Sequence, residues 1–323
     1  MMKLSAIFIF LIVKTITDST ALNLACSEDF EERPENRLLH EGCIIRDLSI
    51  ADSSALEDVI FPSESTIILY KPEIAANVSR ELQNRLENTA KDLIVFGGHV
   101  PELQIWPGLE KLVLFGSQTR GVAIDQNVDQ YNLRVFNAWN CSFDATPANI
   151  NQLTELISFE MYGCNIESVD LGQFDGLSQL IHIGLVRQKI AEVVVTKSVS
   201  LANLTSLSLN DNNLRAVDTR LWRMPNLKRL SLTTNKLRFI IGLERFEELQ
   251  MLELYNNRLN CDWIKYANES LKKERIPAEM LQPCPSTDNV EQQEFCCVGD
   301  RTDPAFQEYL LATETDAPPA TVQ

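Results

Sequence analysis

The chain has 323 residues, which is enough for one elongated array of repeats or for two globular domains. Its 29 basic and 45 acidic residues give a net charge of -16 at pH 7. Because a strongly acidic surface repels phosphate groups, we expect neither nucleic acid nor an anionic membrane as a partner.

Residues 1–21 have the pattern of a secretory signal peptide. Lys3 precedes an apolar run over 4–13, and a polar stretch then ends in small residues at Ala21. The run is too short to cross a bilayer, and no later stretch reaches that length. We therefore predict cleavage near Ala21 and a secreted protein without a membrane span. Four Asn-X-Ser/Thr sequons fit this route and are candidates for N-glycosylation: Asn77, Asn140, Asn203 and Asn268.

An N-terminal cap is predicted over 22–63. Cys26 and Cys43 enclose a short acidic loop, and cysteines this close together in an oxidising compartment are expected to form a disulfide. The segment that starts at Cys43 reads Cys-Ile-Ile-Arg, which is typical of a strand. We predict a disulfide-pinned hairpin that covers the exposed end of the array that follows.

A repeat occupies residues 64–259, and its first unit is irregular. Residues 67–70 fit a strand, and Val78, Leu82 and Leu86 follow at helical spacing, which predicts a helix on the outer side of this unit. Eight further units begin at Ala90, Leu109, Leu133, Leu156, Leu180, Leu204, Leu227 and Leu249. We thus predict about nine stacked coils.

The last three units, from Leu204 to Leu259, follow the frame Leu-x-x-Leu-x-Leu-x-x-Asn-x-Leu. Alternate leucines point inward from a short strand, and the Asn amide bonds the turning backbone. One unit cannot bury its own leucines, so neighbouring units must stack. The pattern predicts an α/β solenoid, a leucine-rich repeat horseshoe with short parallel strands on the concave face and disulfide-braced N- and C-terminal caps. The outer segments around Phe174 and Leu221 are spaced as short helices or 3₁₀ turns.

Cysteine stands at the Asn position in two adjacent units, at Cys141 and Cys164. A thiol can bond the backbone weakly there, which favours two reduced, buried cysteines. Stacked coils also bring these positions close together, which favours a disulfide. The sequence leaves both alternatives open.

A C-terminal cysteine cap is predicted over 260–299. Asp262 is expected to cap a helix that runs to about Arg275. Four cysteines are the disulfide candidates of this cap: Cys261, Cys284, Cys296 and Cys297. The remaining residues, 300–323, are rich in Thr, Pro and Ala, so we predict a disordered tail.

The residue after the second inward leucine faces the concave surface in every unit. Four successive units place an aromatic residue there, and these residues form the predicted protein-binding column: Phe96, Phe115, Trp139 and Tyr162. Two observations oppose this interpretation. Strands favour aromatic residues in any case, and N-terminal elements could cover them. A glycan on Asn140 would also crowd Trp139.

The ingredients of a nucleophile and a base occur on the same face. His182 lies in one column with Ser158 and Ser206 on the flanking units, and Glu160 is one column away. No glycine-flanked nucleophile turn accompanies them, and solvated columns produce such sets by chance. We therefore predict no enzyme, no cofactor and no metal site.

The C-terminal cap carries a more specific resemblance. Cys261-Asp262-Trp263 and the vicinal pair Cys296 and Cys297 resemble the leucine-rich immune proteins of mosquito haemolymph. The resemblance implies a secreted, non-enzymatic innate-immune factor in haemolymph that recognises proteins, such as a complement-like thioester protein or another leucine-rich repeat chain. Long members of that family continue into coiled coils. Only 26 residues follow Cys297 here and they lack heptads, so the chain resembles the short subclass.

Two questions stay open at this stage. If Cys261 pairs with Cys284, the vicinal cysteines are left over, and one of them could link two chains; the protein is then a disulfide-linked dimer rather than a monomer. An extracellular matrix, adhesion or shed receptor-type protein would use the same repeats and the same concave face.

Overall fold

The computed structural model describes residues 22–26, 42–52, 54–57, 59–75, 78–270, 289–292, 295–298, 304 and 306–308. The predicted signal peptide, Asn77 and Cys284 lie outside these residues. Among the described helices, none has the length and apolar character needed to cross a bilayer.

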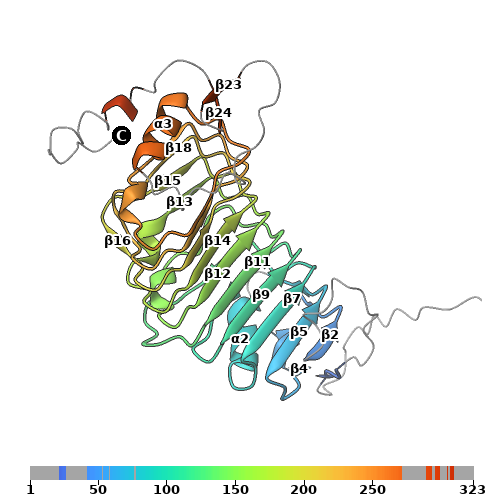
Figure 1. The fold of residues 1–323 in the computed structure, drawn as a ribbon. Helices are drawn as coiled ribbons and strands as arrows, with labels where there is room; N and C mark the ends of the chain where they lie inside the picture. The colour runs from blue at the N-terminus through green and yellow to red at the C-terminus, as the bar shows by residue number, and fades with distance from the viewer. Residues whose placement is uncertain are drawn as a thin grey trace, which may run out of the picture.

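One long parallel sheet organises the described part of the chain, and its ten strands lie side by side in chain order (Figure 1). They are β2 (Cys43–Arg46), β5 (Thr66–Tyr70), β7 (Asp92–Phe96), β9 (Lys111–Phe115), β11 (Val135–Trp139), β12 (Ser158–Tyr162), β14 (His182–Val186), β17 (Ser206–Ser208), β20 (Arg229–Ser231) and β22 (Met251–Glu253). Each strand pairs with the next at the same repeat position. The chain is therefore a leucine-rich repeat solenoid, as the periodicity predicts.

The solenoid begins earlier than the predicted repeats. β2 lies parallel to β5, with Cys43 paired to Ile67 and Arg46 to Tyr70. The predicted hairpin is therefore wrong for this segment, which is the first strand of the main sheet. The reason is that Cys43 and Ile45 are buried in the same core as the leucines of the later coils. β1 (Leu22–Asn23) lies beside β4 (Val59–Ile60), also in parallel.

The side of the coils opposite the main sheet carries short elements (Figure 1). Pairs of short parallel strands there are β3 (Ser49–Ile50) with β6 (Glu73–Ile74), β8 (Glu102–Gln104) with β10 (Gly121–Ala123), β13 (Ser168–Asp170) with β15 (Glu192–Val194), β16 (Val199–Ser200) with β19 (Trp222–Arg223), and β18 (Ala216–Asp218) with β21 (Phe239–Ile241). Helical elements are α1 (Ser54–Glu57), α2 (Ser79–Leu86), η3 (Ile150–Gln152), η4 (Leu171–Phe174) and η5 (Leu243–Arg245).

These outer elements agree only in part with the sequence patterns. The helix predicted from Val78, Leu82 and Leu86 is present as α2, and all three side chains are buried. A helical turn predicted after Leu221 is wrong, because β19 forms there instead. Trp222 pairs with Val199 of the preceding coil and is buried, so the strand gives this residue both a backbone partner and a packed environment.

Every coil leaves the main sheet through a left-handed turn. In each of the ten described coils, the residue directly after the column position, which is the position of Phe96 and Phe115, has a positive φ between 50° and 67°. These residues are Asp47, Lys71, Gly97, Gly116, Asn140, Gly163, Arg187, Asp211, Thr234 and Asn256. A left-handed residue with a side chain is unfavourable by itself, so other interactions must hold the turn. In the later coils the ladder position, two residues after each column position, supplies them through side-chain bonds to the backbone.

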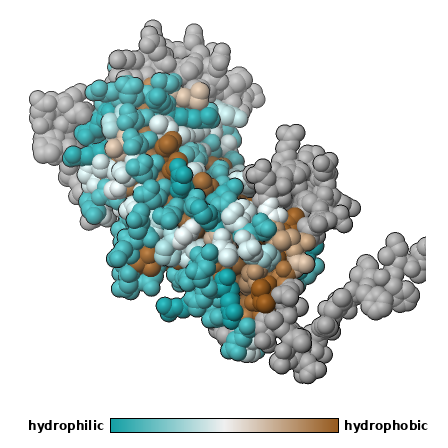
Figure 2. Space-filling model, turned by 90° about the horizontal axis from the view of Figure 1, so that it is seen from below, coloured by the Kyte–Doolittle hydropathy of each residue, from teal (hydrophilic) through white to brown (hydrophobic). Residues whose placement is uncertain are grey.

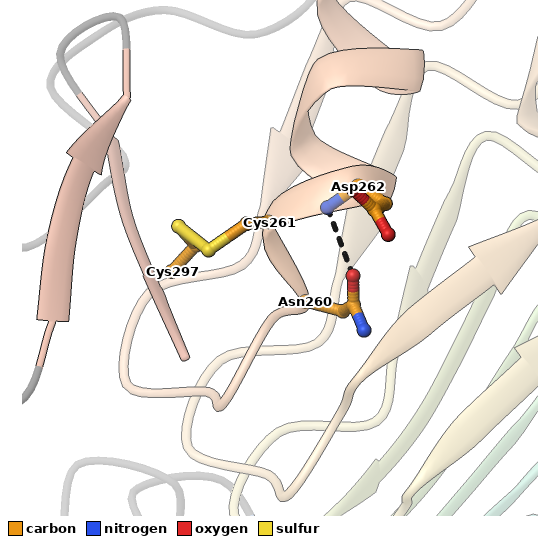
Figure 3. The surroundings of a disulfide bond; sticks show 4 residues. All are labelled: Asn260, Cys261, Asp262 and Cys297. Atoms are coloured by element: carbon orange, nitrogen blue, oxygen red, sulfur yellow. Dashed lines mark hydrogen bonds between the residues drawn. A yellow bond between two sulfur atoms is a disulfide. The ribbon is translucent and has the colours of Figure 1, made fainter. Parts of the chain in front are cut away.

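The C-terminal end is closed by α3 (Cys261–Ser270) and by the antiparallel pair β23 (Asn289–Gln292) and β24 (Phe295–Val298). Figure 3 shows Asn260, not Asp262, at the start of the helix: the backbone N–H of Asp262 donates to Asn260 Oδ1 at 2.8 Å. The predicted cap is therefore wrong by two positions. Asp262 lies in the first turn, where its charge still favours the helix.

The predicted disordered tail is wrong at Phe306. This side chain is fully buried, and its ring packs against Phe239 at 5.7 Å and Tyr266 at 5.7 Å between ring centroids. The low overall hydrophobicity of the tail conceals one aromatic residue that covers the last coil, because a single ring can complete a core without a periodic pattern around it.

Candidate protein-binding surface on the concave face

The strand register brings the predicted aromatic residues into one row on the concave face, the side of the main sheet turned away from the core. Phe96 pairs with Phe115, Phe115 with Trp139, and Trp139 with Tyr162. Tyr70 pairs with Phe96 and extends the row by one coil. Sequence reasoning omitted it because the first unit is irregular, although Tyr70 ends the strand-like run 67–70.

The rings of this row interact with one another. Phe96 stacks on Tyr70 with centroids 5.4 Å apart and on Phe115 with centroids 4.9 Å apart. Phe115 meets Trp139 edge to face at 5.9 Å. Tyr162 instead contacts Arg187, whose Nη1 donates to the tyrosine hydroxyl at 3.0 Å while the guanidinium lies 5.9 Å from the ring centroid. All five rings of the column are half-buried.

The row beside the aromatic column changes character along the solenoid. Its first four members are apolar and at most 5% exposed: Ile44, Ile68, Ile94 and Val113. Tyr70 and Phe96 pack against them. The next members are Asn137, Glu160 and Gly184. The N-terminal part of the concave face thus contains a buried apolar row, which is replaced by Asn137 and Glu160 on the next two coils. One face of the molecule, seen in Figure 2, is mostly hydrophilic with separate small apolar areas.

Asn137 and Glu160 are unusual because their acceptor atoms are unused. Asn137 Oδ1 is buried and has no hydrogen-bond donor within the described part of the chain. Glu160 is half-buried, and among the described residues its carboxylate takes part in no hydrogen bond or ion pair, although its charge raises the pKa of nearby His182. Most buried polar groups are paired, so this orphaned oxygen marks a position where a partner group is missing.

His182 lies in a row with the two serines, as the sequence predicts, because Ser158 pairs with His182 and His182 with Ser206. Within the described residues, however, no hydrogen bond joins the imidazole to either serine. Burial lowers the pKa of His182, and Arg229 lowers it further. An activated nucleophile requires a base within hydrogen-bond reach, and this row does not supply one. No cluster of three or more potential metal ligands occurs in the described ranges.

The ladder position holds the coils together through side-chain bonds to the backbone. Asn212 Nδ2 donates to the carbonyl of Leu185 at 2.8 Å, and its Oδ1 accepts from the N–H of Ile190 at 3.1 Å. Cys164 replaces such an amide with a weak bond from Sγ to the carbonyl of Ala138 at 3.7 Å. Cys141 and Cys164 are both free and buried. Of the two alternatives that the sequence left open, the structure therefore has both cysteines reduced. Burial raises the pKa of the Cys141 thiol to about 11.

Two disulfides brace the ends of the solenoid. Cys26 is bonded to Cys43, the pair predicted from the sequence. Cys261 is bonded to Cys297 (Figure 3), which ties the start of α3 to β24. The pairing of Cys261 with Cys284, on which the dimer argument depended, does not occur.

The described sequons differ in their surroundings. Asn140 is exposed and has a positive φ in the turn directly after Trp139. Asn203 is exposed too, and its Nδ2 donates to the carbonyl of Ser178 at 2.7 Å. Asn268 belongs to α3. A glycan on Asn140 would project from the edge of the aromatic column.

Comparisons with known proteins agree with this architecture. Residues 202–259 match the leucine rich repeat family. A search of curated proteins gave no match. Among solved structures, the chain is similar to the crystal structure of the complex of the mosquito proteins LRIM1 and APL1C, with 17% identity and a TM-score of 0.57 over 85% of this chain and 57% of that chain. It is also similar to the leucine-rich repeat domain of LRIM1, with 18% identity and a TM-score of 0.56 over 83% of this chain and 85% of that chain.

At 17% and 18% sequence identity, these two similarities establish a shared fold alone. The chain spans little more than half the length of the first of these two chains.

Proposed function

We propose that this protein is a secreted, non-enzymatic leucine-rich repeat protein of innate immunity that recognises a protein partner through its concave face. The observation that carries the proposal is the row of half-buried aromatic side chains on the concave face, in which Trp139 and Tyr162 stand beside the polar residues Asn137 and Glu160. Aromatic residues with half-buried rings are the side chains that protein interfaces use most as anchors.

The immune role is supported by two independent likenesses. The fold is similar to that of the mosquito immune proteins LRIM1 and APL1C. The cap motif of Cys261-Asp262-Trp263 with the double cysteine points to the same group. Extracellular residence is supported by the signal-like first 21 residues and by disulfides at both ends of the solenoid. N-terminal sequencing of protein secreted by insect cells tests it, with a new terminus expected near Ala21.

The binding surface is tested by capture from haemolymph with the secreted wild-type chain and with a Trp139→Ala, Tyr162→Ala double variant. Mass spectrometry identifies the captured proteins, and a complement-like thioester protein or another leucine-rich repeat chain is expected among them. Tyr255→Ala is the matched control, because Tyr255 belongs to the same column position in the last coil and is 48% exposed. Loss of a partner in the double variant alone supports the concave surface.

Retention of every partner by a folded double variant would place recognition elsewhere on the molecule. Asn140→Gln adds a second comparison, because removal of a shielding glycan should strengthen capture through Trp139.

An extracellular adhesion protein remains the second candidate, because the same fold and surface would serve it. Induction of the transcript in fat body or blood cells after infection supports immunity. Constant expression in epithelial or neural tissue favours adhesion.

A further inference from the structure

We infer that the partner inserts a basic side chain, lysine or arginine, into a polar site formed by Asn137, Trp139 and Glu160. The inference rests on the proposed role of the concave face in protein recognition, and it names the chemical group that the face accepts. Asn137 and Glu160 are register partners on β11 and β12, and Trp139 follows Asn137 by two residues on the same face.

Asn137 offers an unused hydrogen-bond acceptor. Its Oδ1 is buried without a donor in the described part of the chain. It stands where the buried apolar row of Ile94 and Val113 ends, so apolar side chains flank it on one side. A buried oxygen in such a place is unfavourable until a donor reaches it, and ammonium and guanidinium groups are the side-chain groups richest in donors.

Glu160 differs from the other acidic residues of the concave face in its surroundings. Other acidic side chains on this face have cations of their own chain beside them. Glu253 forms an ion pair with Arg229 at 2.9 Å, and the charge of Lys111 acts on Asp92. Among the residues that the structure describes, Glu160 forms no ion pair, and its titratable neighbour is His182, whose pKa is lowered by burial. A ligand cation would pair with this carboxylate without displacing an existing partner.

The indole ring of Trp139 can receive a cation on its face. Both tyrosines of the column already hold a cation: Arg46 lies 4.9 Å from the Tyr70 ring centroid and Arg187 lies 5.9 Å from that of Tyr162. The surface therefore accommodates guanidinium groups against its rings. Within the described residues, the ring contact of Trp139 is the edge-to-face one with Phe115, and no cation of this part of the chain lies over the indole. Indole binds cations more strongly than the other aromatic rings do.

Two further features agree with a cationic ligand. The net charge of -16 attracts basic partners over long range. A cation on the neighbouring coil, Arg187, belongs to the turn after β14 and is bonded to the Tyr162 hydroxyl, whereas Glu160 lies in the middle of β12.

The test uses three blocked peptides that differ only in the central side chain of Gly-Gly-X-Gly-Gly, with X as arginine, lysine or citrulline. Citrulline keeps the shape of arginine but is neutral. Binding to the secreted full chain is measured by calorimetry and by tryptophan fluorescence. We expect saturable binding of the arginine and lysine peptides and at least about tenfold weaker binding of the citrulline peptide, because hydrogen bonds to charged groups are the stronger ones.

Glu160→Gln should weaken the arginine peptide by about tenfold or more, and Trp139→Ala should weaken it as well. Glu192→Gln is the matched control, because Glu192 is an exposed glutamate on β15, on the opposite side of the coils. Equal binding of arginine and citrulline peptides, or no binding of either, would overturn the inference.

The same variants separate this inference from the proposed function. If partner capture is lost in the Trp139 and Tyr162 double variant but unchanged in Glu160→Gln, the concave face binds proteins and the basic-group assignment fails. If the arginine peptide binds through Glu160 while capture survives the double variant, the cation site stands and the docking surface proposed for the partner fails.

Discussion

Asn235 ties two coils of the solenoid together, because its Oδ1 accepts a hydrogen bond from the backbone N–H of Leu214 at 3.0 Å. Its Nδ2 donates to the carbonyl of Leu209 at 2.9 Å and to that of Leu232 at 3.1 Å. One buried amide therefore satisfies backbone groups of its own coil and of the preceding one, next to the strained turn residue Thr234.

Replacing Asn235 with alanine should destabilise the protein by about 2–4 kcal/mol, because it leaves a backbone N–H and backbone carbonyls buried without partners. The free energy of unfolding in urea measures the change. Asn226→Ala is the control: this exposed amide also donates to the preceding coil, to the carbonyl of Ala202 at 2.7 Å, and its loss should cost less than about 1 kcal/mol. Equal losses in the two variants would contradict the special role of the ladder position.

The free thiols of Cys141 and Cys164 should be unreactive in the folded protein. Burial raises the pKa of both thiols, that of Cys141 to about 11, so the reactive thiolate is scarce at neutral pH. We expect almost no labelling by N-ethylmaleimide in buffer and labelling of both cysteines in denaturant without a reducing agent. A disulfide between them in freshly secreted protein, found by peptide mapping, would contradict the structure.

His182 should make stability depend on pH in a defined direction. Burial and Arg229 lower its pKa below the ordinary value of 6.5, and Glu160 partly opposes this. The unfolded chain therefore takes up a proton before the folded chain does. The contribution of His182 to stability should be constant above about pH 6.5 and should fall as the pH drops below that value.

The measurement is the urea midpoint between pH 8 and pH 5 for the wild type and for His182→Gln. The variant should show a smaller loss of stability toward acid pH. His99→Gln is the control, since His99 bonds Gln118 at 3.3 Å on another coil. Parallel profiles for wild type and His182→Gln would refute the prediction.

The fold could be predicted from the sequence wherever the period was regular. The inward leucines from Leu204 to Leu259 determine where each strand lies, that the coils stack in parallel and which residues pair, because a one-residue slip would expose all of these leucines. The same regular period correctly predicted that Phe115 and Tyr162 lie beside Trp139. The column could be read because the repeat fixes which side of the sheet each residue faces.

What the sequence did not predict depends on single contacts rather than on a period. Cys43 belongs to a coil whose ladder residue departs from the frame, so its membership in the main sheet shows only in the structure. Tyr70 ends a run that was predicted as a strand, but the irregular frame of its unit concealed its place in the aromatic column. Phe306 covers the last coil as one ring in a polar tail. The buried Oδ1 of Asn137 is likewise invisible in a pattern, because it depends on which neighbours lack a donor.

The two cysteines of the C-terminal cap that remain after these assignments are Cys284 and Cys296, and we predict that they bond within one chain. Cys297 is already bonded to Cys261, so neither of the two remaining cysteines can pair with them. Cys284 precedes Cys296 by 12 residues, a separation at which loop closure is easy. Peptide mapping without reduction should join the two, and a non-reducing gel should show a monomer. Cys284→Ser should leave a free Cys296 thiol and produce a disulfide-linked dimer, whereas a reducible dimer of the wild type would show that Cys296 serves to link chains.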